Sequence, residues 1–168
     1  MDLNQTFSSA IQAEKSAGIA FIFLGVFFLI MSGYLFVFAG PDIFIAGAKL
    51  PGLIAGLFIV IGGLFYVRKI DHNFKTQKNA AIQHKADFVK AEIVRAAKLY
   101  KGYKQYSLMW GGLAVISIFF IIIFKRSVYG GLGYVMLLFT IFTIFNEIYA
   151  AAHTGKYLEK LRVYEKLI

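Results

Sequence analysis

Four long apolar runs limit what this chain can fold into; they cover residues 19–39, 50–67, 108–124 and 131–149. A helix needs about 20 predominantly apolar residues to cross the hydrocarbon core of a bilayer, and these runs approach that length. The runs are continuous and lack the alternation of barrel strands, and open strands leave their backbone polar groups unsatisfied in lipid. The sequence therefore predicts an all-α integral membrane protein with four transmembrane helices, in a single polytopic membrane domain over residues 1–168.

The composition agrees with lipid as the main solvent. The chain is 59% hydrophobic and 16% charged, whereas a soluble domain is about 45–50% apolar and about 25% charged. The first run is too long for the apolar region of a signal peptide, so it is expected to be a retained span. The chain contains no cysteine, which excludes disulfides, thiol chemistry and cysteine-ligated metals.

The segments between the runs predict how the spans are paired. Residues 40–49 and 125–130 form short links, which indicate two helical hairpins. A polar segment, 68–106, separates the hairpins, and a polar tail, 150–168, follows the last span.

Two local features refine the second span and the segment after it. Pro51 is expected at the start of the second span, where a proline costs no helical hydrogen bond. Residues 70–85 lack a regular pattern and are expected to contain a turn.

The positive charge is concentrated on one side of the predicted membrane. Of the 18 Lys and Arg residues, 15 lie before the first span, in the central polar segment or in the tail, and the short links carry only Lys49, Lys125 and Arg126. Positively charged loops mark the cytoplasmic side. Both termini are therefore predicted to be cytoplasmic, in an inner or plasma membrane. Topology and attraction to anionic lipid headgroups then explain the net charge of +9, and no nucleic-acid partner is expected.

The polar segments show helical periodicity. Apolar residues recur at steps of three or four before span one, before span three and in the tail, which predicts an amphipathic cytoplasmic helix at each place. The stripes are Phe7, Ala10 and Ile11; Val89, Ile93, Ala96 and Tyr100; and Tyr157, Leu161, Tyr164 and Ile168.

An apolar stripe on a helix must be covered by something, and the candidates are the tail, the lipid surface or another protein. We predict that the helix over 86–104 packs on the C-terminal helix and leaves a composite basic surface for a partner. The residues proposed for this surface are Val89, Ile93, Tyr100, Leu161 and Tyr164. Asp87 and Glu92 are expected to interrupt the basic face.

Glu147, next to Asn146, is the acidic residue closest to a span interior. An ionisable residue inside a membrane is a functional hypothesis because its burial is costly. Glu147 is therefore interpreted as an interfacial anchor, as an ion-pair partner of Arg68 or Lys69, or as an ion- or proton-handling group.

Three histidines, His72, His84 and His153, were considered as metal ligands. His72 and His153 follow spans two and four at similar depth and are expected to face one another. Their spacings match no zinc motif, so they are interpreted as solvated polar residues, and no metal or cofactor is expected.

Aromatic and basic residues alternate just before the third span. Tyrosine favours the headgroup layer and lysine reaches toward it, which indicates membrane-interface anchors. The anchors are Tyr100, Lys101, Tyr103, Lys104 and Tyr106.

Glycines give the second span a surface of small residues, which favours close helix packing in lipid. The packing residues are Gly52, Gly56, Gly62 and Gly63, with Gly18 at the membrane boundary as the comparison position.

These observations favour a non-enzymatic membrane interaction protein, such as an accessory subunit, an assembly factor or a toxin-immunity protein. Spans one to three carry no internal charge, whereas transporters place polar or broken helices at the midplane. The alternative is a subunit of an oligomeric ion channel or small-ion transporter. A lipid-headgroup-modifying enzyme using His72, His153 and Glu147 is third. Expected partners are anionic membrane lipids and another membrane protein or a second copy of the chain.

Overall fold

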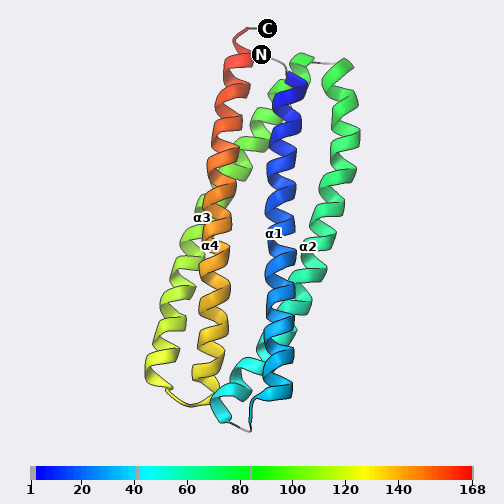
Figure 1. Cartoon of the computed structure of the whole chain (residues 1–168). Coiled ribbons are helices and arrows are strands. Elements are labelled where there is room, and N and C mark those ends of the chain that lie inside the picture. Colours follow the sequence, from blue (N-terminus) through cyan, green and yellow to red (C-terminus); the bar gives the residue numbers. More distant parts are fainter. Residues whose placement is uncertain (1–2, 41, 84, 168) are drawn as a thin grey trace.

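Four long helices make up the computed structural model, which describes residues 3–40, 42–83 and 85–167 apart from the side chains of residues 4 and 75–83. The helices are α1 (Leu3–Phe38), α2 (Ile43–Gln83), α3 (Lys85–Ile123) and α4 (Val128–Glu165), and they stand side by side with both chain termini at one end (Figure 1). In the described part of the chain, each helix contains a stretch long and apolar enough to cross a membrane. The prediction of an all-α protein with four such helices is confirmed and indicates a multi-pass membrane protein.

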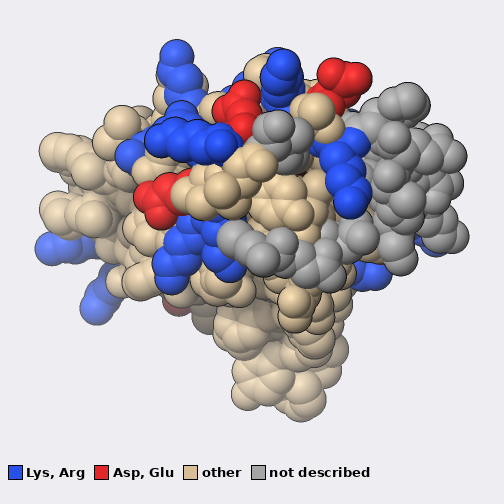
Figure 2. Space-filling view, turned by 90° about the horizontal axis from the view of Figure 1, so that it is seen from above, with Lys and Arg blue, Asp and Glu red and all other residues tan. Residues whose placement is uncertain are grey.

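The helices are longer than a membrane requires. They contain 36 to 41 residues, which corresponds to about 54–62 Å of helix, whereas the hydrocarbon core is about 30 Å thick. Each helix therefore continues well beyond its apolar stretch, toward the end that holds both termini. Lys and Arg side chains gather on this end of the molecule (Figure 2), which we call the basic end; we call the opposite end the far end.

The first connection is shorter than predicted, and Pro51 lies inside α2 instead of at its start. Asp42 explains the early start, because its carboxylate accepts hydrogen bonds from the backbone N–H groups of Phe44 and Ile45, at 2.7 and 3.3 Å. Such a cap satisfies donors of the first helical turn and adds helix before the proline. Pro51 has no N–H, so the carbonyl of Gly47 receives no hydrogen bond from it.

The second connection is also shorter than predicted, because α3 ends at Ile123 and α4 begins at Val128. Arg126 adopts a left-handed backbone conformation, with φ at 57°. Ser127 caps α4, and its side-chain oxygen accepts a hydrogen bond from the N–H of Gly130 at 3.4 Å. A left-handed residue followed by a cap reverses the chain within a few residues.

The polar segment between the second and third spans is helical almost throughout. α2 continues to Gln83 and α3 begins at Lys85, so the change from one helix to the next falls within 70–85, as expected, at the end of that range. The lack of a regular pattern did not mean a lack of helix, since residues 70–83 all belong to α2.

The hydrophobic core lies at the basic end, and all four helices contribute to it. Phe7 of α1 is stacked on Phe74 of α2 and meets Phe88 of α3 edge-on, with ring centroids 5.6 and 5.1 Å apart. α1 packs most extensively on α2 and α3 on α4, whereas the backbones of α2 and α3 approach each other little, and those of α1 and α3 do not come as close anywhere among the described residues.

Candidate functional site

The apolar stripe of α3 meets the stripe of α4 within this chain. Val89 and Leu161 are buried in the same cluster, where they are 1% and 0% exposed. Ile93 and Tyr164 are partly buried and pack against that cluster. Val89 and Leu161 are therefore covered by the chain's own helices, and only the outer parts of this region are accessible to a partner.

A partly buried ionic network joins α1, α3 and α4 beside this core. Arg95 lies between two carboxylates, with its guanidinium 2.7 Å from Glu92 and 3.0 Å from Glu14. The Tyr157 hydroxyl donates a hydrogen bond to Glu92 at 3.1 Å. Glu92 is 3% exposed, so the expectation that it interrupts the basic outer face was wrong, whereas Asp87 is exposed.

The electrostatics of the network follow from burial and close charge pairing. Burial raises the pKa of Tyr157, and the charge of Glu92 raises it further, so the hydroxyl remains a donor. Burial by itself would lower the pKa of Arg95, but the hydrogen bond and charge of Glu92 and the charge of Glu14 outweigh it and raise that pKa. The sequence signal for this network was the placement of Glu92 between the stripe residues Val89 and Ala96.

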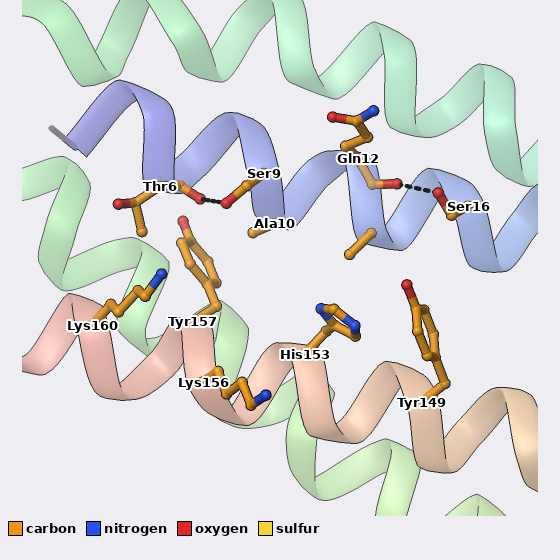
Figure 3. Close-up of a pocket in the computed structure, with 11 residues that line it drawn as sticks. Thr6, Ser9, Ala10, Gln12, Ser16, Tyr149, His153, Lys156, Tyr157 and Lys160 are labelled. Carbon is orange, nitrogen blue, oxygen red and sulfur yellow. Dashed lines mark hydrogen bonds between the residues drawn. The ribbon is translucent and has the colours of Figure 1, made fainter.

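A groove of about 460 Å³ lies between α1 and α4 at the basic end (Figure 3). Its α1 wall carries mainly hydroxyl and amide side chains, and its α4 wall carries two lysines, a histidine and two tyrosines. The polar lining residues are Thr6, Ser9, Gln12, Ser16, Tyr149, His153, Lys156, Tyr157 and Lys160. A groove that holds both ammonium and hydroxyl donors suits an anionic group.

The structure does not place His72 with His153 in this groove. His153 lies against the ring of Tyr149, with ring centroids 4.3 Å apart, and His72 is not among the lining residues. His84 lies outside the described residues. Within the described residues, no three His, Asp or Glu side chains lie close enough together to hold a metal ion.

The predicted interface anchors separate into inward-facing and outward-facing residues. Tyr100 is half-buried against α4, where a Cβ added to Gly155 would lie 3.1 Å from its ring. The ammonium group of Lys104 lies 4.5 Å from the centre of the same ring. Tyr103 turns inward and interacts with Tyr66 through the hydroxyl groups. Lys101 and Lys104 are exposed, whereas Tyr106 is about half exposed and lines a cavity together with Tyr103.

Glycines bring α1 and α2 into close contact. A Cβ added to Gly56 would lie 2.9 Å from the carbonyl oxygen of Gly25, and one added to Gly63 would lie 2.7 Å from the side chain of Ile22. A Cβ on Gly52 would overlap the hydroxyl of Ser32. Gly62 differs, since an added Cβ would meet nothing within 4 Å.

Two positions on α1 were misjudged or missed from the sequence. Gly18 cannot serve as a neutral comparison position, because a Cβ there would lie 2.9 Å from the side chains of Tyr66 and Val67. Gly25, which the sequence analysis did not single out, faces Gly56 backbone to backbone. A rule based on glycine spacing within one helix cannot identify the facing glycine on another.

Small polar residues form the contact between α3 and α4. Ser117, Thr140 and Thr143 are almost completely buried, and each hydroxyl donates to a carbonyl of its own helix at 2.8–3.0 Å. A Cβ added to Gly133 would lie 3.1 Å from the carbonyl of Ser117. The sequence signal was a row of small residues in the fourth span, which had been considered only at its glycine-rich start.

Glu147 and Asn146 line a cavity of about 330 Å³ among the four helices. One carboxylate oxygen of Glu147 is buried and has no hydrogen-bond partner among the described residues. An ion pair of Glu147 with Arg68 or Lys69 is absent from the described part of the chain. Glu147 thus remains an acid whose second oxygen is not satisfied by the protein.

The structure thus has three candidate sites. They are the basic end, where the four helices share a core, the groove suited to an anionic group, and the cavity containing a carboxylate. Comparison with known proteins assigns none of them a role, since no protein-family model, no curated protein and no solved structure matches this chain.

Proposed function

We propose that this protein is a non-enzymatic membrane interaction protein, such as an accessory subunit, an assembly factor or a toxin-immunity protein, and that it holds its partner at the basic end. The observation that carries the proposal is that the four helix ends are packed together at the basic end. The shared core and the network of Glu14, Arg95, Glu92 and Tyr157 join them into one unit. A pre-organised surface loses less conformational entropy when it binds.

The proposal includes an orientation. The pairs α1–α2 and α3–α4 would form two transmembrane hairpins whose amphipathic ends, with both termini, lie in the cytoplasm. The uneven distribution of Lys and Arg supports this orientation. A periplasm-specific reporter such as alkaline phosphatase should be silent when fused at Ile168 and active when fused near Ile45. Activity at Ile168 with silence near Ile45 would overturn the orientation.

The chemistry of the basic end favours an acidic partner segment. Lys156 and Lys160 line the groove between α1 and α4, and Lys160 points toward α1 beside Thr6 (Figure 3). Further Lys and Arg side chains lie on the outside of this end (Figure 2). Attraction to anionic lipid headgroups adds about 1 kcal/mol for each Lys or Arg near the surface and helps to position the end.

Copurification from a mild detergent, with mass spectrometry, tests the proposal. Wild-type protein should retain a stoichiometric membrane partner, and Lys156→Glu with Lys160→Glu should lose it because the groove then repels acidic groups. The matched control is Lys125→Glu with Arg126→Glu at the far end, which should retain the partner. A partner that both variants hold equally would contradict a role for the basic end. A clean homo-oligomer that conducts in planar bilayers would instead support the ion-channel alternative.

A further inference from the structure

The cavity around Glu147 lies where the two helix pairs meet. Phe21 of α1, Tyr66 of α2, Tyr103 of α3 and Phe139 of α4 all line it. A cavity of about 330 Å³ falls at the lower end of the range of small-molecule sites.

The lining changes character along the helices. Tyr66, Tyr103 and Glu147 lie near the ends of the apolar stretches that face the basic end, whereas Ile59 and Phe139 lie about two turns deeper in the spans. The cavity is thus polar near the membrane boundary and apolar toward the midplane. This gradient matches an amphiphile whose head lies at the boundary and whose chain points into the membrane.

Glu147 specifies the chemistry of the head. Its buried oxygen lacks a hydrogen-bond partner among the described residues. An ionised carboxylate only accepts hydrogen bonds, and leaving it buried and unpaired is costly. A primary ammonium group supplies both a positive charge and N–H donors. A hydroxyl head lacks the charge, and a quaternary ammonium head lacks the donors.

Gly62 leaves room for the chain of such a ligand. A Cβ at Gly62 would meet nothing within 4 Å, although the neighbouring Gly63 packs tightly on Ile22. Glycine weakens a helix relative to alanine, and at position 62 no contact with a described residue of another helix requires it. The missing side chain therefore keeps this wall of the cavity open.

We propose that the cavity binds the primary ammonium head of an amphiphile at Glu147 and accommodates its aliphatic chain between Ile59, Gly62 and Phe139. The shared chemistry belongs to aminophospholipids of the adjoining leaflet and to free alkylamines. This site is separate from the partner surface at the basic end, so either proposal can fail without the other.

Thermal unfolding of the full chain in a mild non-ionic detergent tests the site, with dodecylammonium chloride as the probe. Dodecylammonium should raise the midpoint temperature in a saturable manner, whereas dodecanol and dodecyltrimethylammonium should not. Glu147→Gln should weaken the apparent affinity for dodecylammonium about tenfold or more, because a charge-assisted hydrogen bond is lost. Glu159→Gln, an exposed acid on the same helix, should leave that affinity unchanged.

A second pair of variants tests the apolar part without touching the carboxylate. Gly62→Leu should fill the cavity and weaken binding, whereas Gly112→Leu, where an added Cβ also meets nothing within 4 Å, should not. Comparable stabilisation by dodecanol, or an unchanged affinity in Glu147→Gln, would overturn the proposal and indicate simple partitioning of the chain.

Nanodiscs distinguish the two sources of the amine. If the protein is more stable in phosphatidylethanolamine than in phosphatidylcholine nanodiscs, and Glu147→Gln removes this difference, the ligand is the aminophospholipid. If dodecylammonium stabilises the protein in a Glu147-dependent manner but the two lipids do not differ, the ligand is a free alkylamine.

Discussion

The basic end and the membrane-spanning part are built from the same four helices, yet they are packed in opposite ways. At the basic end large side chains point inward, and Phe7, like Val89 and Leu161, is about 1% exposed or less. In the spanning part many large side chains point outward, with Phe23 and Phe58 71% and 74% exposed, although Phe28 is buried. The helices there touch through residues such as Gly25, Gly56, Ser117 and Thr140.

The contrast follows from the two solvents. Water favours the burial of large apolar side chains, so the basic end has a core like that of a soluble helical protein. Lipid offers no such driving force, because its tails are as apolar as the side chains, and helices associate there by close backbone approach. One continuous helix therefore obeys two packing rules along its length.

The largest effect is expected when a charge is placed in the core of the basic end. Leu161→Asp should reduce the free energy of unfolding by about 4 kcal/mol or more, because it removes a buried side chain and introduces an unpaired charge. Val163→Asp, at an exposed position of the same helix, should cost about 0.5 kcal/mol or less. Thermal unfolding in detergent and protease sensitivity of the tail measure both.

Ile93→Asp extends this test to the facing helix. Because Ile93 packs against the cluster that contains Leu161, the double variant should lose less stability than the sum of the single variants. Strict additivity, with unchanged protease sensitivity in both single variants, would contradict the packing of these two stripes.

An intermediate effect is expected in the partly buried ionic network. Arg95→Met leaves Glu92 buried without its cation and should cost about 3 kcal/mol. The comparison is Lys15→Met, which breaks the half-exposed pair with Asp71 and should cost about 0–1 kcal/mol. Adding Glu92→Gln to Arg95→Met should restore part of the loss. Equal costs for Arg95→Met and Lys15→Met would show that the network is no stronger than a surface pair.

The smallest effect is expected in the spanning part, where the packing is less dependent on large side chains. Gly56→Leu should cost about 1–3 kcal/mol because α1 and α2 must separate. Gly112→Leu, which meets nothing within 4 Å, is the control and should leave stability in detergent nearly unchanged. If the two variants behave alike, close backbone approach does not hold this part together.

Particular residues show how far the sequence could predict the site. The periodic stripes on α3 and α4 were visible because the spacing of apolar residues follows the helical repeat. Glu92 was misplaced, since its charge suggested solvent while its position on the stripe indicated burial. Gly62 and Gly63 are adjacent and chemically identical, yet only Gly63 faces another helix of the chain.

The sequence by itself determined which segments are apolar and which are polar, and the existence of four helices able to span a membrane. Hydropathy and periodicity are sums over neighbouring residues, so they require no knowledge of the fold. Only the tertiary structure decided which face of each helix is covered, that Arg95 lies between Glu14 and Glu92, and that Glu147 opens into a cavity. Those outcomes depend on the rotation and close approach of all four helices, and packing between residues far apart in the chain sets both.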